Sequence, residues 1–441
     1  MLSELLSEKK YIDFKNAIDE INAIDAADFL TYVDPAILPK VFRLLKKDTA
    51  AEIFPELDSS LQENIISSIT DTEISKLIEE LFIDDTVNML EELPASVVDR
   101  ILRVAKPQTR AEINKFLNYP PDSAGSVMTS EFLYIHENMT VKEAIDRIRK
   151  NGADKETIYV VYVTDRARIL KGFIELKDLI FSDPADLIAD VMDTAIISAQ
   201  TIEPKEDAAA LISKYDLLAL PIVDKENRLV GIVTVDDALD VIEEEATEDI
   251  EIMAAISPTD KPYLKLGVFE TWKKRIPWLL LLLLSATFTG SIISHYESAL
   301  GSMVILTAFI PMLMGTGGNA GGQASATIIR GLSLDEIKTK NIFNILWKEF
   351  RISVLCGITL SIVIFLKALI WDRTSVQVAL VVAVSLLLTV VIAKIVGSAL
   401  PVLAKQLRLD PAVMASPFIT TIVDAVSLLI YFQIASYALG I

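Results

Sequence analysis

Long apolar stretches occupy only the second part of the chain. After Arg275, five of them cover approximately residues 276–295, 302–328, 352–371, 376–403 and 411–439. Each is long enough to cross about 30 Å of hydrocarbon as a helix of about 20 residues. Five in series favour membrane spans over the alternative, buried helices of a large soluble protein.

The first 123 residues have a different pattern. Apolar positions recur at helical spacing, and Pro or Asp stands at the breaks, which predicts helices only. The segment 52–57 resembles the segment 88–93, which lies 36 residues later. This echo predicts stacked helical hairpins of a solenoid kind over residues 1–123.

Residues 124–241 alternate strand-like apolar runs with amphipathic helices, and the order occurs twice. The segment from Gly172 to Asp178 recurs as the segment from Gly231 to Asp237. We therefore expect two α/β modules, 124–187 and 188–241. A helix continues from Asp237 to Met253 and leads into the connecting (plug) helix expected over 242–268. An all-α membrane domain of five helices, 269–441, follows.

Charge follows the same division. The 441 residues carry a net charge of −20 although their mean hydropathy is +0.43. From Ile276 onward, seven acidic and ten basic residues give +3, which leaves −23 for the part before it. An acidic half of this kind excludes a nucleic-acid binder, because phosphate contacts need clustered Lys and Arg. The single cysteine, Cys356, excludes a disulfide framework, and the charged start of the chain predicts no signal peptide.

Basic residues in the short loops predict the orientation. They cluster before the first span, between the second and third, and between the fourth and fifth. Because Lys and Arg accumulate on the cytoplasmic side, we expect a multi-pass protein of the plasma membrane with a cytoplasmic N-terminus and an outside C-terminus.

The second span contains a segment unlike the others, from Pro311 to Gln323, with two amides and five glycines at membrane depth. Asn319 and Gln323, at i and i+4, lie on one helix face. Such a face is expected along a protein interface or a water-filled path. Close helix packing through Gly317 and Gly321 is the alternative.

Asp424 is the only acidic residue deep inside a span. A carboxylate at this depth is a candidate for an ion path or a proton relay. Thr420 and Thr421, one turn before it, are expected to add hydroxyl oxygens on the same side. A structural ion pair with Lys394 of the fourth span is the alternative.

The available ligands indicate a hard cation. The chain has one Cys and two His that are far apart, so no site for zinc, copper or iron is expected. Carboxylate, hydroxyl and amide oxygens suit Mg²⁺, which one or two carboxylates commonly hold through retained waters. Asp424 doubled by a twofold axis would match that preference.

The two α/β modules resemble a tandem pair of cystathionine-β-synthase (CBS) domains. The resemblance implies that an adenosine nucleotide such as ATP binds here, with Thr234 and Asp237 at the ribose and Gly125 in the same site. Helix capping by Thr234 is an equal alternative. In the first module Glu175 stands where Thr or Ser is expected.

The connecting helix is strongly acidic. Glu245, Glu248 and Asp249 share one helix face, where like charges destabilise a helix unless cations bridge them. A solvated acidic helix is the alternative to a cation sensor.

The order of parts resembles the MgtE family of magnesium channels along nearly the whole chain. The strongest local matches are Gly315–Gln323, the run from Asp410 to Val413, Ser416-Pro417 with Asp424 following, and Glu245–Asp249. The resemblance implies a homodimer in a lipid bilayer, with a pore lined by the second and fifth spans. Its implied pore residues are Asp424, Asp410 near the inner mouth, Asn319, Gln323, Ser416, Thr420 and Thr421.

The same resemblance implies cytoplasmic Mg²⁺ sites at Glu52, Asp84, Glu206, Asp216, Asp237, Asp240, Glu245, Glu248 and Asp249. A further acid of the family is Asn88 here, which weakens one of these sites. We therefore expect a Mg²⁺ channel, not an enzyme, that closes when cytoplasmic Mg²⁺ bridges its acidic surfaces. A secondary transporter of Mg²⁺ or Co²⁺, coupled to protons or another gradient, is the alternative.

Overall fold

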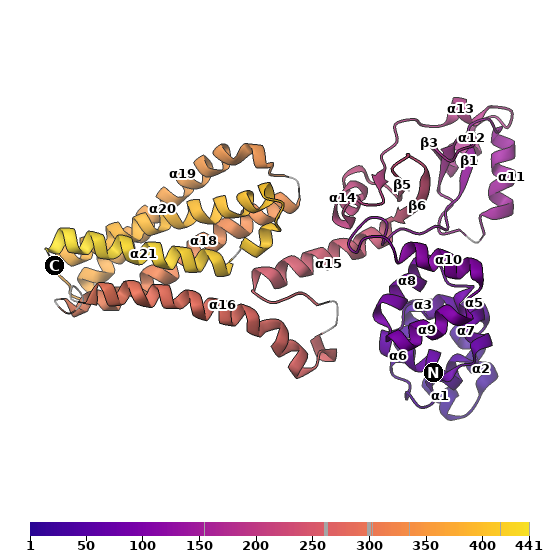
Figure 1. Ribbon diagram of the computed structural model, residues 1–441, viewed down its shortest axis with the longest axis horizontal. Helices are drawn as coiled ribbons and strands as arrows, with labels where there is room; N and C mark the ends of the chain where they lie inside the picture. Colours follow the sequence, from indigo (N-terminus) through magenta and orange to yellow (C-terminus); the bar gives the residue numbers. More distant parts are fainter. Residues whose placement is uncertain are drawn as a thin grey trace. The chain divides into compact units, whose positions relative to one another are not determined.

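The chain folds into two compact units, Met1–Ile242 and Glu243–Ile441. The computed structural model describes residues 1–153, 155–259, 263–297, 301, 303–334, 336–414 and 416–440. Each unit has its own hydrophobic core. Figure 1 shows the helices and strands of both units.

The first part of the N-terminal unit is helical. Its helices are α1 (Leu2–Ser7), α2 (Tyr11–Asp19), α3 (Ala23–Thr31), α4 (Leu38–Phe42), α5 (Lys47–Ile53), α6 (Ser59–Ser68), α7 (Asp71–Ile78), α8 (Ile83–Glu92), α9 (Ala95–Val104) and α10 (Pro107–Phe116). Helices α5, α6 and α7 begin 36 residues before α8, α9 and α10 respectively. The repeat read from the sequence is therefore a repeat of helices.

Apolar side chains at matching places in this repeat form one core. Ile65 of α6 and Ile101 of α9 are both fully buried. Helix α7 begins with a capping box, in which the Thr70 hydroxyl and the Glu73 carboxylate each accept a backbone N–H of the other residue. Burial of apolar area supplies most of the driving force for stacking such short helices.

The α/β part contains two copies of one arrangement. The first copy has β1 (Tyr134–His136), α11 (Val141–Asn151), β2 (Val160–Thr164), β3 (Leu170–Glu175) and α12 (Leu176–Phe181). The second has α13 (Ile188–Val191), β4 (Ala199–Gln200), α14 (Lys205–Tyr215), β5 (Ala219–Val223) and β6 (Leu229–Thr234). In each copy the central strand pairs in parallel with the strand before it and antiparallel with the strand after it.

The two copies are joined by reciprocal contacts. Thr129 bridges to Ile232 of the second sheet, and Phe173 of the first sheet bridges to Asp193. The buried Tyr162 hydroxyl donates to the Ala219 carbonyl at 3.0 Å. Both predicted α/β modules are therefore present, and they contact each other.

Helix α15 (Val235–Met253) follows directly on β6. The connecting segment expected over 242–268 is thus helical only as far as Met253, and a short 3₁₀ turn, η1 (Tyr263–Lys265), follows before the next helix. Ala255, with φ +58°, lies just past this helix end.

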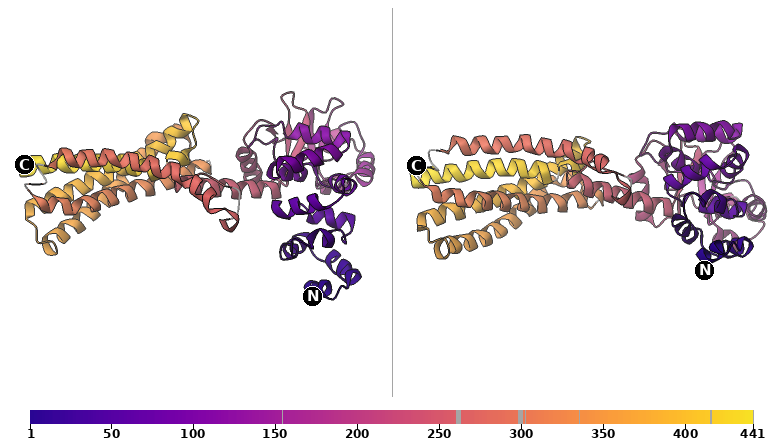
Figure 2. Two further views of the ribbon diagram at one scale, coloured as in Figure 1. Left: turned by 60° about the horizontal axis from the view of Figure 1, so that its bottom comes forward. Right: turned by 90° about the horizontal axis from the view of Figure 1, so that it is seen from below.

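The C-terminal unit is a helical bundle. It contains α16 (Val268–His295), η2 (Val304–Phe309), α18 (Ile310–Ser333), η3 (Thr339–Asn341), α19 (Ile342–Ile370), α20 (Val376–Gln406), η4 (Pro411–Met414) and α21 (Ser416–Leu439). Among the described residues, five segments are long and apolar enough to cross a membrane. They run side by side in both views of Figure 2, with α18 packed on α20 and α21, and α16 on α21.

Candidate functional site

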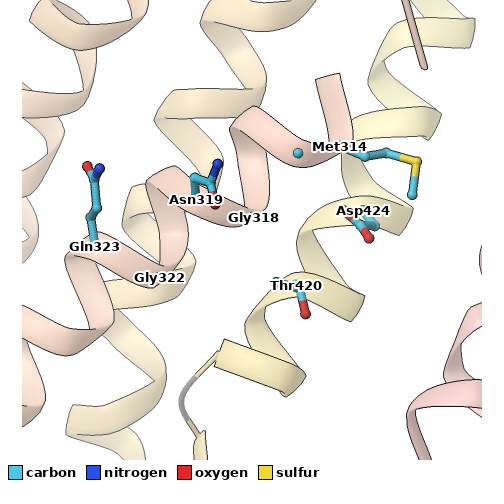
Figure 3. A pocket seen from close by; sticks show the side chains of 8 residues that line it. Met314, Gly318, Asn319, Gly322, Gln323, Thr420 and Asp424 are labelled. Atoms are coloured by element: carbon cyan, nitrogen blue, oxygen red, sulfur yellow. The ribbon is translucent and has the colours of Figure 1, made fainter. Parts of the chain in front are cut away.

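A cavity of ≈ 370 Å³ lies between α18 and α21. Helix α18 contributes Met314, Gly315, Gly318, Asn319, Gly322 and Gln323, and α21 contributes Thr420 and Asp424. Figure 3 shows Thr420 and Asp424 one turn apart on the same side of α21. The cavity therefore unites the unusual segment of the second span with the one deep carboxylate of the fifth.

The glycines of α18 serve two different purposes. A Cβ atom on Gly317 would lie 2.8 Å from side-chain atoms of Thr389 and Val423, and one on Gly321 would lie 2.7 Å from Ile419. Gly315 and Gly322 have open space beside them instead. One face of α18 thus packs closely on its neighbours, as the packing alternative expects, while another borders the cavity. The water-filled path along this second face stays a prediction.

Asp424 is half-buried, and its carboxylate makes no hydrogen bond or ion pair with any described residue. The alternative of an Asp424–Lys394 ion pair is absent from the described part of the chain, because Lys394 lines a different cavity. An intramembrane carboxylate without a protein partner is costly unless a cation or water meets it.

Thr421 does not face this cavity. It lines a separate cavity of ≈ 680 Å³ between α16 and α21, together with Phe288 and His295. Successive residues of a helix point about 100° apart, so Thr420 faces Asp424's cavity while Thr421 turns toward α16. The expectation that both threonines lie on the path side is wrong for Thr421. The side chain of Ser416 lies outside the described residues.

Asn319 and Gln323 are exposed on α18 although they lie in a membrane-spanning helix. Neither amide group forms a hydrogen bond with the described part of the protein. Amide groups without a hydrogen-bond partner at membrane depth must face water or another protein surface rather than lipid.

Two expected acids meet at the cytoplasmic end predicted for the bundle. The Ser333 hydroxyl at the end of α18 donates to Asp249 of α15 at 3.3 Å. Burial, followed by the negative charge of Asp410, raises the pKa of Asp249. Asp410 itself accepts the Ala412 N–H at 2.8 Å, which starts η4. The structure thus brings Asp249 and Asp410 together.

A second acidic cluster lies inside the N-terminal unit. Burial, then the charges of Asp85 and Asp237, raises the pKa of Asp84 to about 8. Burial, followed by the negative charge of Asp237, raises the pKa of Asp85 to about 6. Burial and then the charge of Asp237 likewise raise the pKa of Glu156 to about 7. These four carboxyl groups, which we call the Asp84 cluster, come from α8, the loop before β2 and α15.

Sequence reasoning named Asp84 and Asp237 but missed Glu156. Glu156 is in a loop 72 residues after Asp84, and neither periodicity nor a motif marks it. Of the other expected sensor residues, Glu52, Glu206, Asp216, Asp240 and Glu248 are exposed, Glu245 is half-buried, and Asn88 is exposed one turn after Asp84. Within the described ranges, no three His, Cys, Asp or Glu side chains stand close enough to hold a metal ion.

The residues expected at the ribose form a helix cap. The Thr234 hydroxyl donates to the Asp237 carboxylate at 2.6 Å, and the Thr234 N–H donates to it at 3.4 Å. Thr234 is buried, and Gly125 lies so close to Thr201 and Tyr119 that a Cβ would clash with both. The Asp237 carboxylate therefore already has a partner at the start of α15, and the ribose-binding and capping roles of Thr234 both stay predictions.

Three family models match the chain. MgtE, described as a divalent cation transporter, matches residues 310–434, and the MgtE intracellular N domain matches residues 21–122. The CBS domain matches residues 124–183 and 188–244. Together they cover the helical part, both α/β copies and most of the bundle.

Relatives match along almost the whole length. The magnesium transporter MgtE of Bacillus subtilis is 35% identical over 432 residues, 98% of this chain and 95% of the relative. The magnesium transporter MgtE of Thermus thermophilus is 36% identical over 438 residues, 98% and 97% of the two chains.

Solved structures match the N-terminal unit. The soluble part of a magnesium transporter superposes with a TM-score of 0.53 at 31% identity, covering 56% of this chain and 96% of the other. The cytosolic domain of the Mg²⁺ channel MgtE in complex with ATP gives a TM-score of 0.52 at 35% identity, covering 54% and 98%. With its five apolar helices the protein is a multi-pass membrane protein, and the chain belongs to the MgtE family of magnesium transporters.

Proposed function

We propose that this protein is a channel for Mg²⁺ uptake whose pore runs between α18 and α21 of two copies of the chain. The carboxylate of Asp424 carries the proposal, because it faces a cavity at membrane depth without a partner among the described residues. Thr420, Asn319 and Gln323 line the same cavity and add oxygen atoms. These are ligands that Mg²⁺ accepts directly or through its waters.

Two copies are favoured by the exposed amide face of α18. Asn319 and Gln323 cannot face lipid without a large cost, and a second copy would enclose them in a shared aqueous path. A twofold axis would also supply two Asp424 carboxylates. Two carboxylates balance the charge of one Mg²⁺ ion.

We propose that cytoplasmic Mg²⁺ closes this pore. Asp249 and Asp410 repel each other, as do the members of the Asp84 cluster. Two unit charges about 4 Å apart cost ~4 kcal/mol at an effective dielectric of about 20, so a bridging cation strongly favours the close arrangement. Mg²⁺ binding only to the closed state would then couple internal Mg²⁺ to closure.

The orientation and the nucleotide site are part of the same proposal. Basic residues in alternate loops favour a cytoplasmic N-terminal unit, which would then be exposed to internal Mg²⁺. A relative's cytosolic domain was solved with ATP, which supports an adenosine nucleotide at the CBS pair. Since Asp237 is engaged by Thr234, a ribose would have to share that carboxylate.

Replacement of Asp424 tests the pore. In proteoliposomes with an internal Mg²⁺ indicator, Asp424→Asn should lower the initial rate of Mg²⁺ entry by about tenfold or more, because a charge-assisted contact is worth ~1.5–3 kcal/mol. Thr421→Val is the matched control and should conduct normally, since Thr421 lines the other cavity. Normal entry through a folded Asp424→Asn protein would remove Asp424 from the pore.

A further inference from the structure

A second polar cavity lies in the bundle, between α18, α19 and α20, and has a volume of ≈ 440 Å³. It shares only Asn319 and Gln323 with the Asp424 cavity. Its remaining lining residues are Thr316, Ala320, Leu355, Cys356, Thr359, Leu360, Val390 and Lys394. We call it the Lys394 cavity.

Lys394 has no counter-charge in this cavity. Its side chain is only 6% exposed, and no carboxylate is among the lining residues. Its ammonium group makes no ion pair or hydrogen bond with any described residue. A buried ammonium at membrane depth costs at least a few kcal/mol unless a group of opposite charge or a good acceptor meets it.

The polar side chains around Lys394 can also donate hydrogen bonds. Thr316, Asn319 and Gln323 make no side-chain hydrogen bond with the described part of the chain. Thr359 differs, because its hydroxyl donates to the Leu355 carbonyl at 2.9 Å. One ammonium, two carboxamide NH₂ groups and one hydroxyl therefore remain available as donors at one cavity.

We infer that the Lys394 cavity binds a small monovalent inorganic anion of the halide class. The ammonium repels a metal cation, and the available donors match an acceptor of negative charge. The other wall is apolar, formed by Ala320, Leu355 and Val390, so a multiply charged and strongly hydrated anion would find too few donors. The volume lies within the range of small-ligand sites and leaves room for retained water.

Several residues that line the Lys394 cavity are exposed on the surface of the bundle, so an ion can reach it from there. Leu355, Thr359 and Leu360 of α19 are exposed at its rim, as are Asn319 and Gln323 of α18. An anion held here would neutralise a positive charge behind the amide wall that both cavities share. Anion binding itself does not depend on the proposed pore.

Chloride is the probe that tests this site. Full-length protein in nanodiscs, free of divalent cations, would be titrated with radiolabelled chloride at constant ionic strength, with gluconate as the replacing anion. The wild type should bind chloride saturably, and bromide should compete. Lys394→Met should weaken binding by about tenfold or more, since charged hydrogen bonds are worth ~1.5–3 kcal/mol.

Two variants separate this site from a general effect of charge. Lys340→Met removes an exposed lysine outside the cavity and should bind chloride like the wild type. Lys394→Arg keeps the charge and should retain binding. If Lys394→Met does not fold, Lys394→Gln takes its place as a polar, neutral residue of similar length.

Absence of saturable chloride binding in the wild type would overturn the inference. Wild-type affinity in a folded Lys394→Met or Lys394→Gln protein would overturn it as well. Loss of magnesium flux in Asp424→Asn bears only on the pore, so the two proposals fail separately.

Discussion

Single residues on α18 and α20 determine how close the helices of the bundle come. Gly397 of α20 lies against Gly321 of α18, and a Cβ added at Gly397 would stand 2.3 Å from the Gly321 carbonyl oxygen. The sequence indicated that Gly317 and Gly321, four residues apart, could form a helix-packing face. It did not indicate that Gly397 of another helix would pack against them. Partner positions on another helix depend on helix rotation, which composition and spacing leave open.

Gly397→Ala is expected to destabilise the bundle. The new methyl group meets backbone rather than a movable side chain, so α18 and α20 must separate, and overpacking of this kind costs ~1–3 kcal/mol. Thermal unfolding in detergent, followed by tryptophan fluorescence, should show a lower midpoint than the wild type. Gly290→Ala on α16, where the added Cβ meets nothing within 4 Å, should leave the midpoint unchanged or raise it. Equal effects of both changes would contradict this packing argument.

Titration of the Asp84 cluster gives a prediction with a definite sign. In an unfolded chain these carboxyl groups lose their protons near pH 4, whereas the fold raises the pKa of Asp84 to about 8, of Glu156 to about 7 and of Asp85 to about 6. The native state then binds more protons than the unfolded state between these limits. Stability is highest at the acidic end of this window and is lost as pH rises toward 8.

Circular dichroism of the fragment 1–253 would measure this effect, since solved structures of two relatives consist of the corresponding soluble part alone. The unfolding midpoint should fall from pH 5 to pH 8 without Mg²⁺, and Asp84→Asn should flatten the curve. Hydrogen bonds from Thr70 lower the pKa of Glu73 to about 2. Glu73 therefore changes the pH dependence of stability only at more acidic pH. A midpoint that rises across this window would show that the cluster is not buried as described.

At the scale of whole elements, hydropathy located the five membrane helices but misjudged where some begin. Helix α19 starts at Ile342, ten residues before the apolar stretch, and α16 starts at Val268. Charged residues such as Lys348, Glu349 and Arg351 lie inside α19. Hydropathy reports contact with hydrocarbon, whereas a helix can continue beyond it, so the apolar stretch marks only part of the element.

Helix α15 is the element on which the proposed gate depends. The triple variant Glu245→Gln, Glu248→Gln, Asp249→Asn removes three charges from one helix face, including the Asp249 carboxylate near Asp410. Without ligands for a bridging cation, high internal Mg²⁺ no longer favours the closed state, so the channel should keep conducting when internal Mg²⁺ is high. Patch recordings or indicator-loaded proteoliposomes at low and high internal Mg²⁺ would measure this.

Charge loss alone must be separated from loss of this acidic face. Glu243→Gln with Glu244→Gln neutralises two neighbouring acids of α15 and should leave inhibition by Mg²⁺ largely intact. Inhibition of the triple variant at the wild-type Mg²⁺ concentration would exclude this face from the gate. Inhibition lost equally in both variants would indicate a general effect of helix charge.

At the scale of the whole molecule, the sequence predicted the order of parts better than their contacts. The net charge of −23 before Ile276, the two repeats and the five apolar stretches are local or additive properties, so they can be counted. The meeting of Asp84 with Glu156, or the rotation of Thr421 away from Asp424, depends on how separate elements pack. Long-range contacts of this kind leave no periodic trace in the chain.

The exposed amide face of α18, formed by Asn319 and Gln323, also leads to a prediction about the assembly of two copies. If its exposed amide face borders a path shared with a second copy, then Gln323→Cys, in a Cys356→Ser background, should be joined to its counterpart by a short bis-maleimide in native membranes. Val363→Cys is the control, because Val363 is 60% exposed on α19 within an apolar surface suited to lipid. A dimer band from Gln323→Cys alone supports the shared path, because thiols linked by a short spacer must come from facing surfaces. A band from Val363→Cys alone would instead place the interface on α19 and leave the amides of α18 facing water within a single copy.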